Sequence, residues 1–219
     1  MLFLRREKIS KTPFIGLSIF KIKAISYGYV VAVLGFMAIF TNAVLLPFYL
    51  TDIMHLNPVQ IGLLLLPFPA ALAVASPVSG VLSEKYSARF ITTAGLGFVL
   101  CGALLFAFIG DSPSYAYIVL AQLIMGTGSG TFQVPNNNTV ISAAPKNKLG
   151  IVSSVNALAR NAGMIMGIAL SVAVYAAVQG AYLRAGAAAQ SAFLHGYQAA
   201  MFFGAALAVA GGVFSLRRV

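Results

Sequence analysis

Long apolar stretches alternate with short polar connections along the chain, and the stretches have the length of membrane-spanning helices. An α-helix rises ~1.5 Å per residue, so crossing a hydrocarbon core ~30 Å thick takes about 20 residues. The pattern therefore predicts an all-α, polytopic membrane bundle in residues 26–219, preceded by a basic leader in residues 1–25. The six predicted spans are residues 27–50, 59–82, 90–109, 115–143, 149–178 and 198–216.

The connections between the predicted spans are short, so neighbouring spans must run antiparallel. Residues 179–197 are the longest connection, and their small side chains predict an extracytoplasmic loop. Lysine and arginine gather in alternate connections and at both ends, so the positive-inside rule predicts that both termini are cytoplasmic. These cations are Arg5, Arg6, Lys8, Lys11, Lys21, Lys23, Lys85, Arg89, Lys146, Lys148, Arg217 and Arg218.

Composition excludes a soluble domain. The chain is 60% hydrophobic and 8% charged, with a mean hydropathy of +0.92, whereas soluble domains carry about 25% charged residues. A net charge of +10 would suit a nucleic-acid partner. These cations border the spans, however, which predicts contact with the lipid bilayer and no nucleic acid. We expect a multi-pass protein of the cell membrane, typically a bacterial inner membrane.

Polar and small residues recur on one face of the predicted span 115–143. Gln122, Gly126, Gly130, Gln133 and Asn137 follow one another at spacings of four, four, three and four, which places them on one side of a helix. The amides are candidates for the wall of a substrate cavity, although they also suit hydrogen bonds to a neighbouring helix. The two glycines favour close helix packing.

A further cavity candidate, Asn42, lies near the middle of the first predicted span. A single amide at that depth also suits a hydrogen bond to a neighbouring helix, so both interpretations stay open.

The predicted span 149–178 repeats the polar arrangement, with Asn156, Arg160, Gly163 and Gly167 on one face. Arg160 lies roughly 18 Å beyond the preceding cationic connection. An arginine inside the membrane costs ~2.5–3.5 kcal/mol unless water or a partner meets it. It therefore either reaches cytoplasmic water or amides of the span before it, or lines a pathway and helps to switch the bundle. The two glycines form a second close-packing motif.

The connection after the second predicted span carries a family signature. Gly80, Leu82 and Arg89 stand at the positions of Gly-x-Leu-x-Asp-Arg-x-Gly-x-Arg, with Glu84 and Lys85 as conservative replacements. An acid and bases at two helix ends can form a latch that breaks and re-forms when bundles move. This segment resembles the gating loop of the major facilitator superfamily. The run that ends Gln133-x-Pro-Asn resembles the C-terminal half of its fourteen-span drug:proton antiporters.

The resemblance implies one half of a two-bundle transporter that works by alternating access. It implies that the first and fourth spans line the cavity, the second and fifth meet an N-terminal half or a second copy, and the third and sixth face lipid. It also implies proton-driven export of drugs or amphipathic small molecules. Residues 2–4 then read as the remnant of a preceding span.

The acidic residues limit what this chain does alone. Glu7, Asp52, Glu84 and Asp111 all fall in the leader or connections, whereas proton coupling needs a carboxylate inside the membrane. No cofactor, metal site or catalytic residue is predicted, because the chain lacks the motifs of intramembrane enzymes. The alternative to a transporter half is a self-standing six-span interaction or scaffold protein, or a fragment inactive in transport.

Overall fold

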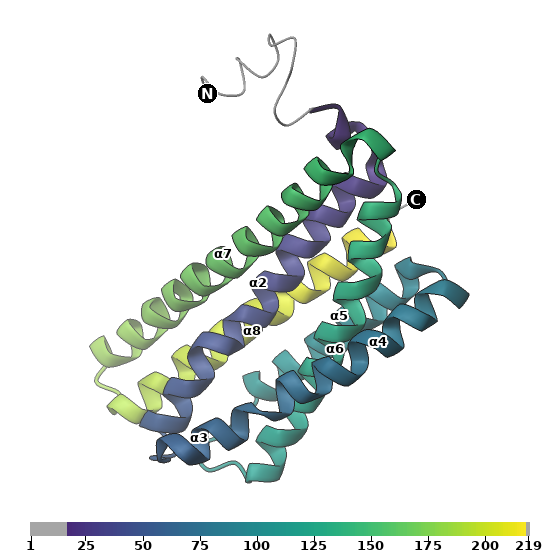
Figure 1. Ribbon diagram of the computed structural model, residues 1–219. Helices are drawn as coiled ribbons and strands as arrows, with labels where there is room; N and C mark the ends of the chain where they lie inside the picture. Colours follow the sequence, from purple (N-terminus) through teal and green to yellow (C-terminus); the bar gives the residue numbers. More distant parts are fainter. Residues whose placement is uncertain (1–16, 218–219) are drawn as a thin grey trace.

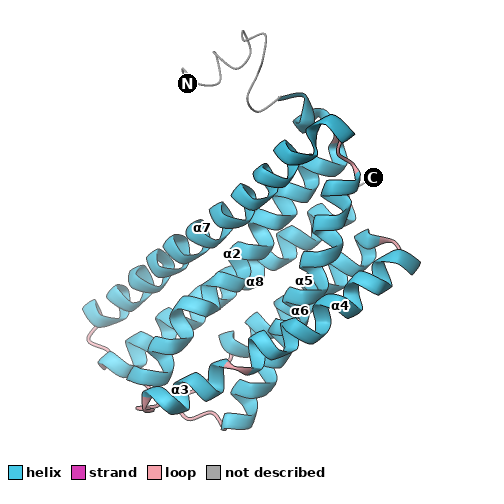
Figure 2. Cartoon of the chain, viewed as in Figure 1, coloured by secondary structure: helices cyan, strands magenta, loops and turns pink. Residues whose placement is uncertain are grey.

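Helices dominate the fold, as expected for apolar segments that must satisfy their own backbone hydrogen bonds in lipid. The computed structural model describes residues 17–217, and this part of the chain contains no β-strand. Figure 2 shows helices joined by short loops. The elements are η1 (Leu17–Lys21), α2 (Lys23–Asp52), α3 (Pro58–Leu65), α4 (Pro67–Lys85), α5 (Ala88–Ala107), α6 (Tyr115–Ser142), η2 (Lys146–Lys148), α7 (Leu149–Arg184) and α8 (Ala189–Leu216).

The second predicted span, residues 59–82, is divided into α3 and α4 at Leu66. Proline has no N–H and disturbs the helical ladder beside it, and Pro67 follows this residue directly. The chain stays helical through the break, because the Leu66 N–H donates to the Gly62 carbonyl at 3.2 Å. An Asn57–Gln60 capping box fixes the start of α3. The segment is therefore one bent span.

The prediction of a long loop at residues 179–197 is wrong. Helix α7 continues to Arg184 and α8 begins at Ala189, so the connection is residues 185–188. Alanine has the highest intrinsic helix propensity, and this stretch is rich in alanine. The predicted spans 149–178 and 198–216 followed hydropathy alone and are consequently too short. Gly186, at φ +83°, provides the left-handed residue of the turn.

Long helices run antiparallel along a common direction, and the start of α2 and the end of α8 lie at the same end of the bundle (Figure 1). Helix α2 packs against α7 and α8, and α6 lies between α4 and α5 with α2 along another side. The start of α2 and the end of α8 share one end of the bundle with the α4–α5 and α6–α7 turns. We call this the basic end, because Lys85, Lys146 and Lys148 lie there.

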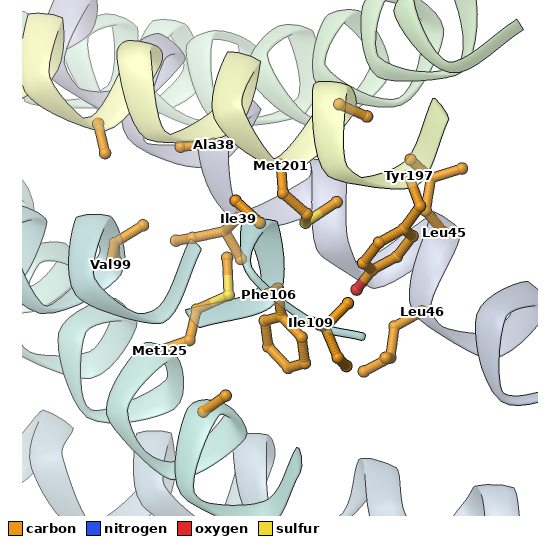
Figure 3. Packing of buried hydrophobic residues seen from close by; sticks show 14 of the residues in the cluster. Ala38, Ile39, Leu45, Leu46, Val99, Phe106, Ile109, Met125, Tyr197 and Met201 are labelled. Carbon is orange, nitrogen blue, oxygen red and sulfur yellow. The ribbon is translucent and has the colours of Figure 1, made fainter. Parts of the chain in front are cut away.

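Burial is distributed unevenly among the helices. In the most apolar window of each segment, 67% of α2 is buried, against 6% of α3–α4 and 17% of α7. The main core joins α2, α5, α6 and α8, as Figure 3 shows for Ile39, Phe106, Met125 and Met201. Helices α4 and α7 therefore present long apolar surfaces outside this core.

Helix α6 differs from its neighbours in polarity. Within residues 17–217, five helical segments are long and apolar enough to cross a membrane: α2, α3–α4, α5, α7 with η2, and α8. Helix α6 is as long, at 28 residues, but its amides, hydroxyls and glycines lower its hydropathy. It packs against α5, α4 and α2. The six-helix bundle is present, with one helix suited to protein neighbours instead of lipid.

The basic leader falls mostly on residues 1–16, which lie outside the described residues, as do the predicted span remnant at 2–4 and the cations before residue 17. The described part, η1, packs on the basic end: Ile19 is buried with Ile25, Val140 and Val152. Helix α2 begins at Lys23, slightly before the predicted bundle start.

Candidate functional site

Three polar side chains from three helices meet in the core. Asn42 of α2 donates from Nδ2 to Gln122 Oε1 of α6 at 3.4 Å. Tyr197 of α8 donates its hydroxyl to Asn42 Oδ1 at 3.1 Å. Asn42 and Gln122 are each 3% exposed, and Tyr197 is fully buried. Buried polar groups are stable when they are hydrogen-bonded to one another, so this amide cluster fixes the relative positions of α2, α6 and α8.

The amide cluster leaves one donor group for a ligand. Gln122 Oε1 accepts from Asn42, and the Gln122 amide nitrogen has no hydrogen-bond partner among residues 17–217. A pocket of about 200 Å³ opens beside it. Its other lining residues are Ile39, Ala43, Leu46, Leu65 and Phe68. An apolar pocket with one oriented amide suits a neutral group that accepts a hydrogen bond.

Aromatic and amide side chains close the end of the bundle opposite the basic end. The rings of Tyr49 and Tyr197 lie 5.0 Å apart, and the Tyr49 hydroxyl donates to the Gly110 carbonyl. Gln198 Nε2 donates to the Ile109 carbonyl at 2.8 Å, and Figure 3 shows the Tyr197 ring beside Ile109. The amide cluster is consequently sealed on this side.

A second set of polar contacts lies nearer the basic end. Asn136 Nδ2 donates to the Gly28 carbonyl at 3.1 Å. Asn156 Nδ2 donates to Asn137 Oδ1 at 2.9 Å, which joins α7 to α6. Gln133 Nε2 donates within α6 to Ser129 Oγ at 2.6 Å. The predicted cavity amides therefore divide into two groups, with Asn42 and Gln122 deep in the bundle.

Arg160 is separate from both polar groups. Its side chain is exposed on α7, and no hydrogen bond or ion pair to it occurs within residues 17–217. The link from α7 to the α6 amides is made by Asn156, one turn before it. Asn156 keeps one buried atom, Oδ1, without a hydrogen-bond partner in the described part of the chain. Of the two predicted intramembrane polar residues, only Asn156 contacts the α6 face.

The predicted packing glycines lie where helix backbones cross. A Cβ on Gly130 of α6 would stand 2.8 Å from the Leu72 carbonyl of α4, and Gly126 faces Phe68 in the same way. A Cβ on Gly163 of α7 would stand 2.6 Å from the Val33 carbonyl of α2, and one on Gly167 would stand 2.7 Å from Met37. These contacts exclude larger side chains because packed interiors have little free space.

Sequence reasoning missed a third glycine contact and the tyrosine of the amide cluster. A Cβ on Gly95 of α5 would stand 2.5 Å from the Phe132 nitrogen, and Gly128 lies against the same part of α5. Tyr197 was placed in a predicted loop. The sequence feature that could have identified it is a tyrosine within an alanine-rich stretch, because alanine favours a helix there.

The predicted gating loop is a tight turn at the basic end. Glu84 and Lys85 are exposed at the end of α4, and Arg89 is half-buried in the first turn of α5. The Arg89 guanidinium lies 4.8 Å from the Phe90 ring centroid. Gly80 has more room than the packing glycines, because a Cβ there would meet Val134 only at 3.5 Å.

These features define a helical membrane bundle with hydrogen-bonding groups inside and a small pocket beside them. The Major Facilitator Superfamily model matches residues 3–168, so the chain belongs to this family of transporters. It is 33% identical over 168 residues to the uncharacterized transporter YebQ of Escherichia coli. It is 32% identical over 177 residues to the riboflavin transporter RibZ of Clostridioides difficile and 26% identical over 180 residues to the multidrug efflux pump LfrA of Mycolicibacterium smegmatis.

The matched relatives are much longer than the matched part. The alignments take in 77% of this chain and 37% of YebQ, 80% and 38% for RibZ, and 80% and 35% for LfrA. The chain thus spans well under two thirds of the length of these relatives.

Proposed function

We propose that this chain is the C-terminal half of an exporter of drugs or amphipathic small molecules, and that the amide cluster is part of its binding site. The observation that carries the proposal is the amide of Gln122, whose oxygen accepts from Asn42 and which lines an apolar pocket between α2, α3–α4 and α6. Multidrug pumps and a riboflavin transporter among the relatives support this substrate class.

The proposed ligand is a neutral or amphipathic molecule with a carbonyl or similar acceptor. The pocket lining is apolar apart from Asn42 and Gln122, so binding rests on apolar contact plus one hydrogen bond. Tyr197 and Asn42 act as positioning residues, because their hydrogen bonds hold the Gln122 amide in one orientation. Fixing a donor in advance reduces the entropy that binding must overcome.

Proton coupling, as we propose it, uses a carboxylate of the other half. Asp52 and Glu84 are exposed at the ends of α2 and α4, and Asp111 is exposed in the connection between α5 and α6. A carboxylate for proton coupling must be buried in the membrane, so the proposed driving force requires a partner bundle. An N-terminal half is therefore the proposed partner for proton coupling. A second copy of this chain, the other candidate partner, would bring the same exposed carboxylates and no further one.

The exposed apolar surfaces of α4 and α7 support the proposal that this chain works with a partner bundle. Only 6% and 17% of their most apolar windows are buried, although both helices carry close-packed glycine contacts on one side. We propose that the other bundle covers part of these surfaces, with the basic end in the cytoplasm under the positive-inside rule. A self-standing scaffold protein is the alternative.

The test is transport of riboflavin and tetracycline, the compounds that two relatives are named for, by this chain expressed together with the proposed N-terminal half. We expect Gln122→Leu to lower transport by up to about tenfold, since a neutral hydrogen bond to a bound ligand is worth ~0.5–1.5 kcal/mol. Gln190→Leu, at an exposed glutamine of α8, is the matched control. Equal transport by both variants would show that Gln122 is not part of the binding site.

A further inference from the structure

An apolar groove runs along the outer side of the bundle, away from the amide cluster. It has a volume of about 640 Å³ and is lined by α4, α6 and the start of α5. On α6 its residues are Leu123, Thr127 and Thr131, spaced by four positions. Gln122 and Asn136, which bond to α2, lie on a different face of the helix. The groove therefore opens away from α2.

The cause of the groove is the divergence of α4 and α5 from a short turn. Both helices pack closely on α6 and little on each other. Gly126 and Gly130 draw α4 onto one side of α6, while Gly128 draws α5 onto another. The surface of α6 between them, at Thr127, stays open and forms the floor.

The length of the groove matches one leaflet of a bilayer. On α4 its lining extends from Ala70 to Leu82, which is roughly 18 Å of helix. One leaflet contributes about 15 Å of hydrocarbon, half of a ~30 Å core. A single acyl chain lying along the groove would therefore reach from the bilayer midplane to the headgroup region.

A cation stands where the headgroup of such a lipid would lie. Val74, Val78 and Leu82 line the groove, and Lys85 continues the same helical face at a spacing of three. Lys85 is exposed in the last turn of α4. Glu84 is also exposed, but it precedes Lys85 by one position and so projects from another face.

We propose that the groove binds one acyl chain of an anionic phospholipid, with Lys85 against the lipid phosphate. The apolar lining, the length of one leaflet and the cation at the mouth each match a different part of the lipid. The net charge of +10 favours an anionic over a zwitterionic headgroup. The site is separate from the amide cluster. It uses the side of α4 that faces Ile91 of α5, so the other bundle of the proposed transporter would cover the remaining exposed side of α4.

The chain contains no tryptophan, which provides a clean fluorescence test. Leu82→Trp places one reporter in the groove beside Lys85. The protein is reconstituted in phosphatidylcholine vesicles with increasing amounts of either dibrominated phosphatidylglycerol or dibrominated phosphatidylcholine, and quenching gives the relative binding constant of the two lipids. We expect phosphatidylglycerol to be preferred about fivefold, the typical effect of one cation near an anionic surface.

Removing the cation tests the headgroup contact. Lys85→Gln in the reporter protein should abolish the preference for phosphatidylglycerol over phosphatidylcholine. Lys146→Gln, at another exposed lysine of the basic end, should leave that preference unchanged. Equal quenching by both lipids in the reporter protein would overturn the proposal. A preference that survives Lys85→Gln would overturn it as well.

A second measurement tests the acyl-chain contact without the tryptophan. Protein solubilised from phosphatidylglycerol vesicles should retain about one phospholipid per chain after washing in detergent. Thr127→Phe fills the groove floor and should reduce retention by at least about half. Leu158→Phe, at an exposed position of α7, should retain as much as the parent. Equal retention by Thr127→Phe and the parent would show that the groove does not hold the lipid.

Discussion

Replacing Tyr197 by phenylalanine removes one hydroxyl from the core and leaves Asn42 Oδ1 without its donor. Asn42 is 3% exposed, so water does not readily replace the lost partner. An unsatisfied buried group costs ~1–3 kcal/mol in soluble proteins. In membrane bundles, measured couplings average ~0.6 and reach ~1.7 kcal/mol, because the unfolded chain in lipid also finds partners. We therefore expect Tyr197→Phe to lower the free energy of unfolding by about 1 kcal/mol.

A double-mutant cycle isolates the contact itself. Tyr197→Phe and Asn42→Leu, singly and together, are compared by unfolding in mixed micelles with increasing dodecyl sulfate. The Tyr197–Asn42 bond is 3.1 Å long, and the Asn42–Gln122 bond is 3.4 Å. A second cycle pairs Asn42→Leu with Gln122→Leu, and the coupling of the shorter bond should exceed that of the longer one. Tyr182→Phe, at an exposed tyrosine of α7, is the control. A coupling of zero in both cycles would refute the amide cluster as a structural unit.

Other expected outcomes concern the helix contacts and the exposed arginine. Gly130→Ala should destabilise the bundle by ~1–3 kcal/mol, because its Cβ would meet the α4 backbone, whereas Gly80→Ala should be nearly neutral; unfolding free energies check both. Arg160→Ala should abolish export by the assembled transporter at normal membrane levels, because Arg160 is exposed on the helix that we propose the other bundle covers. Unchanged export would show that Arg160 takes no part in transport. Asn156→Leu should lower the free energy of unfolding by about 0.6 kcal/mol, and an unchanged value would show that its bond to α6 contributes nothing.

The sequence predicted helix number and order well, because span-length apolar stretches and short connections leave few other arrangements. Helix ends were predicted less well where hydropathy and helix propensity diverge. Residues 179–197 are insufficiently apolar to be recognised as a span, yet their alanines extend α7 to Arg184 and start α8 at Ala189.

The contacts within the site depend on the rotation of each helix, which periodicity gives only relative to its own axis. Asn42 and Gln122 were both candidates, but nothing in their spacing shows that they bond to each other and to Tyr197. Likewise, Asn156 and Arg160 share a helical face, yet only Asn156 reaches α6. Small differences in angle and side-chain length decide such contacts.

The central claim is that this chain is one half of a two-bundle transporter. Its most direct test is uptake of riboflavin and tetracycline into proteoliposomes with an imposed proton gradient. We predict no gradient-dependent transport by the purified chain alone, and transport once the proposed N-terminal half is reconstituted with it. Gradient-dependent transport by the chain alone would contradict the account, and so would the absence of transport by the two bundles together.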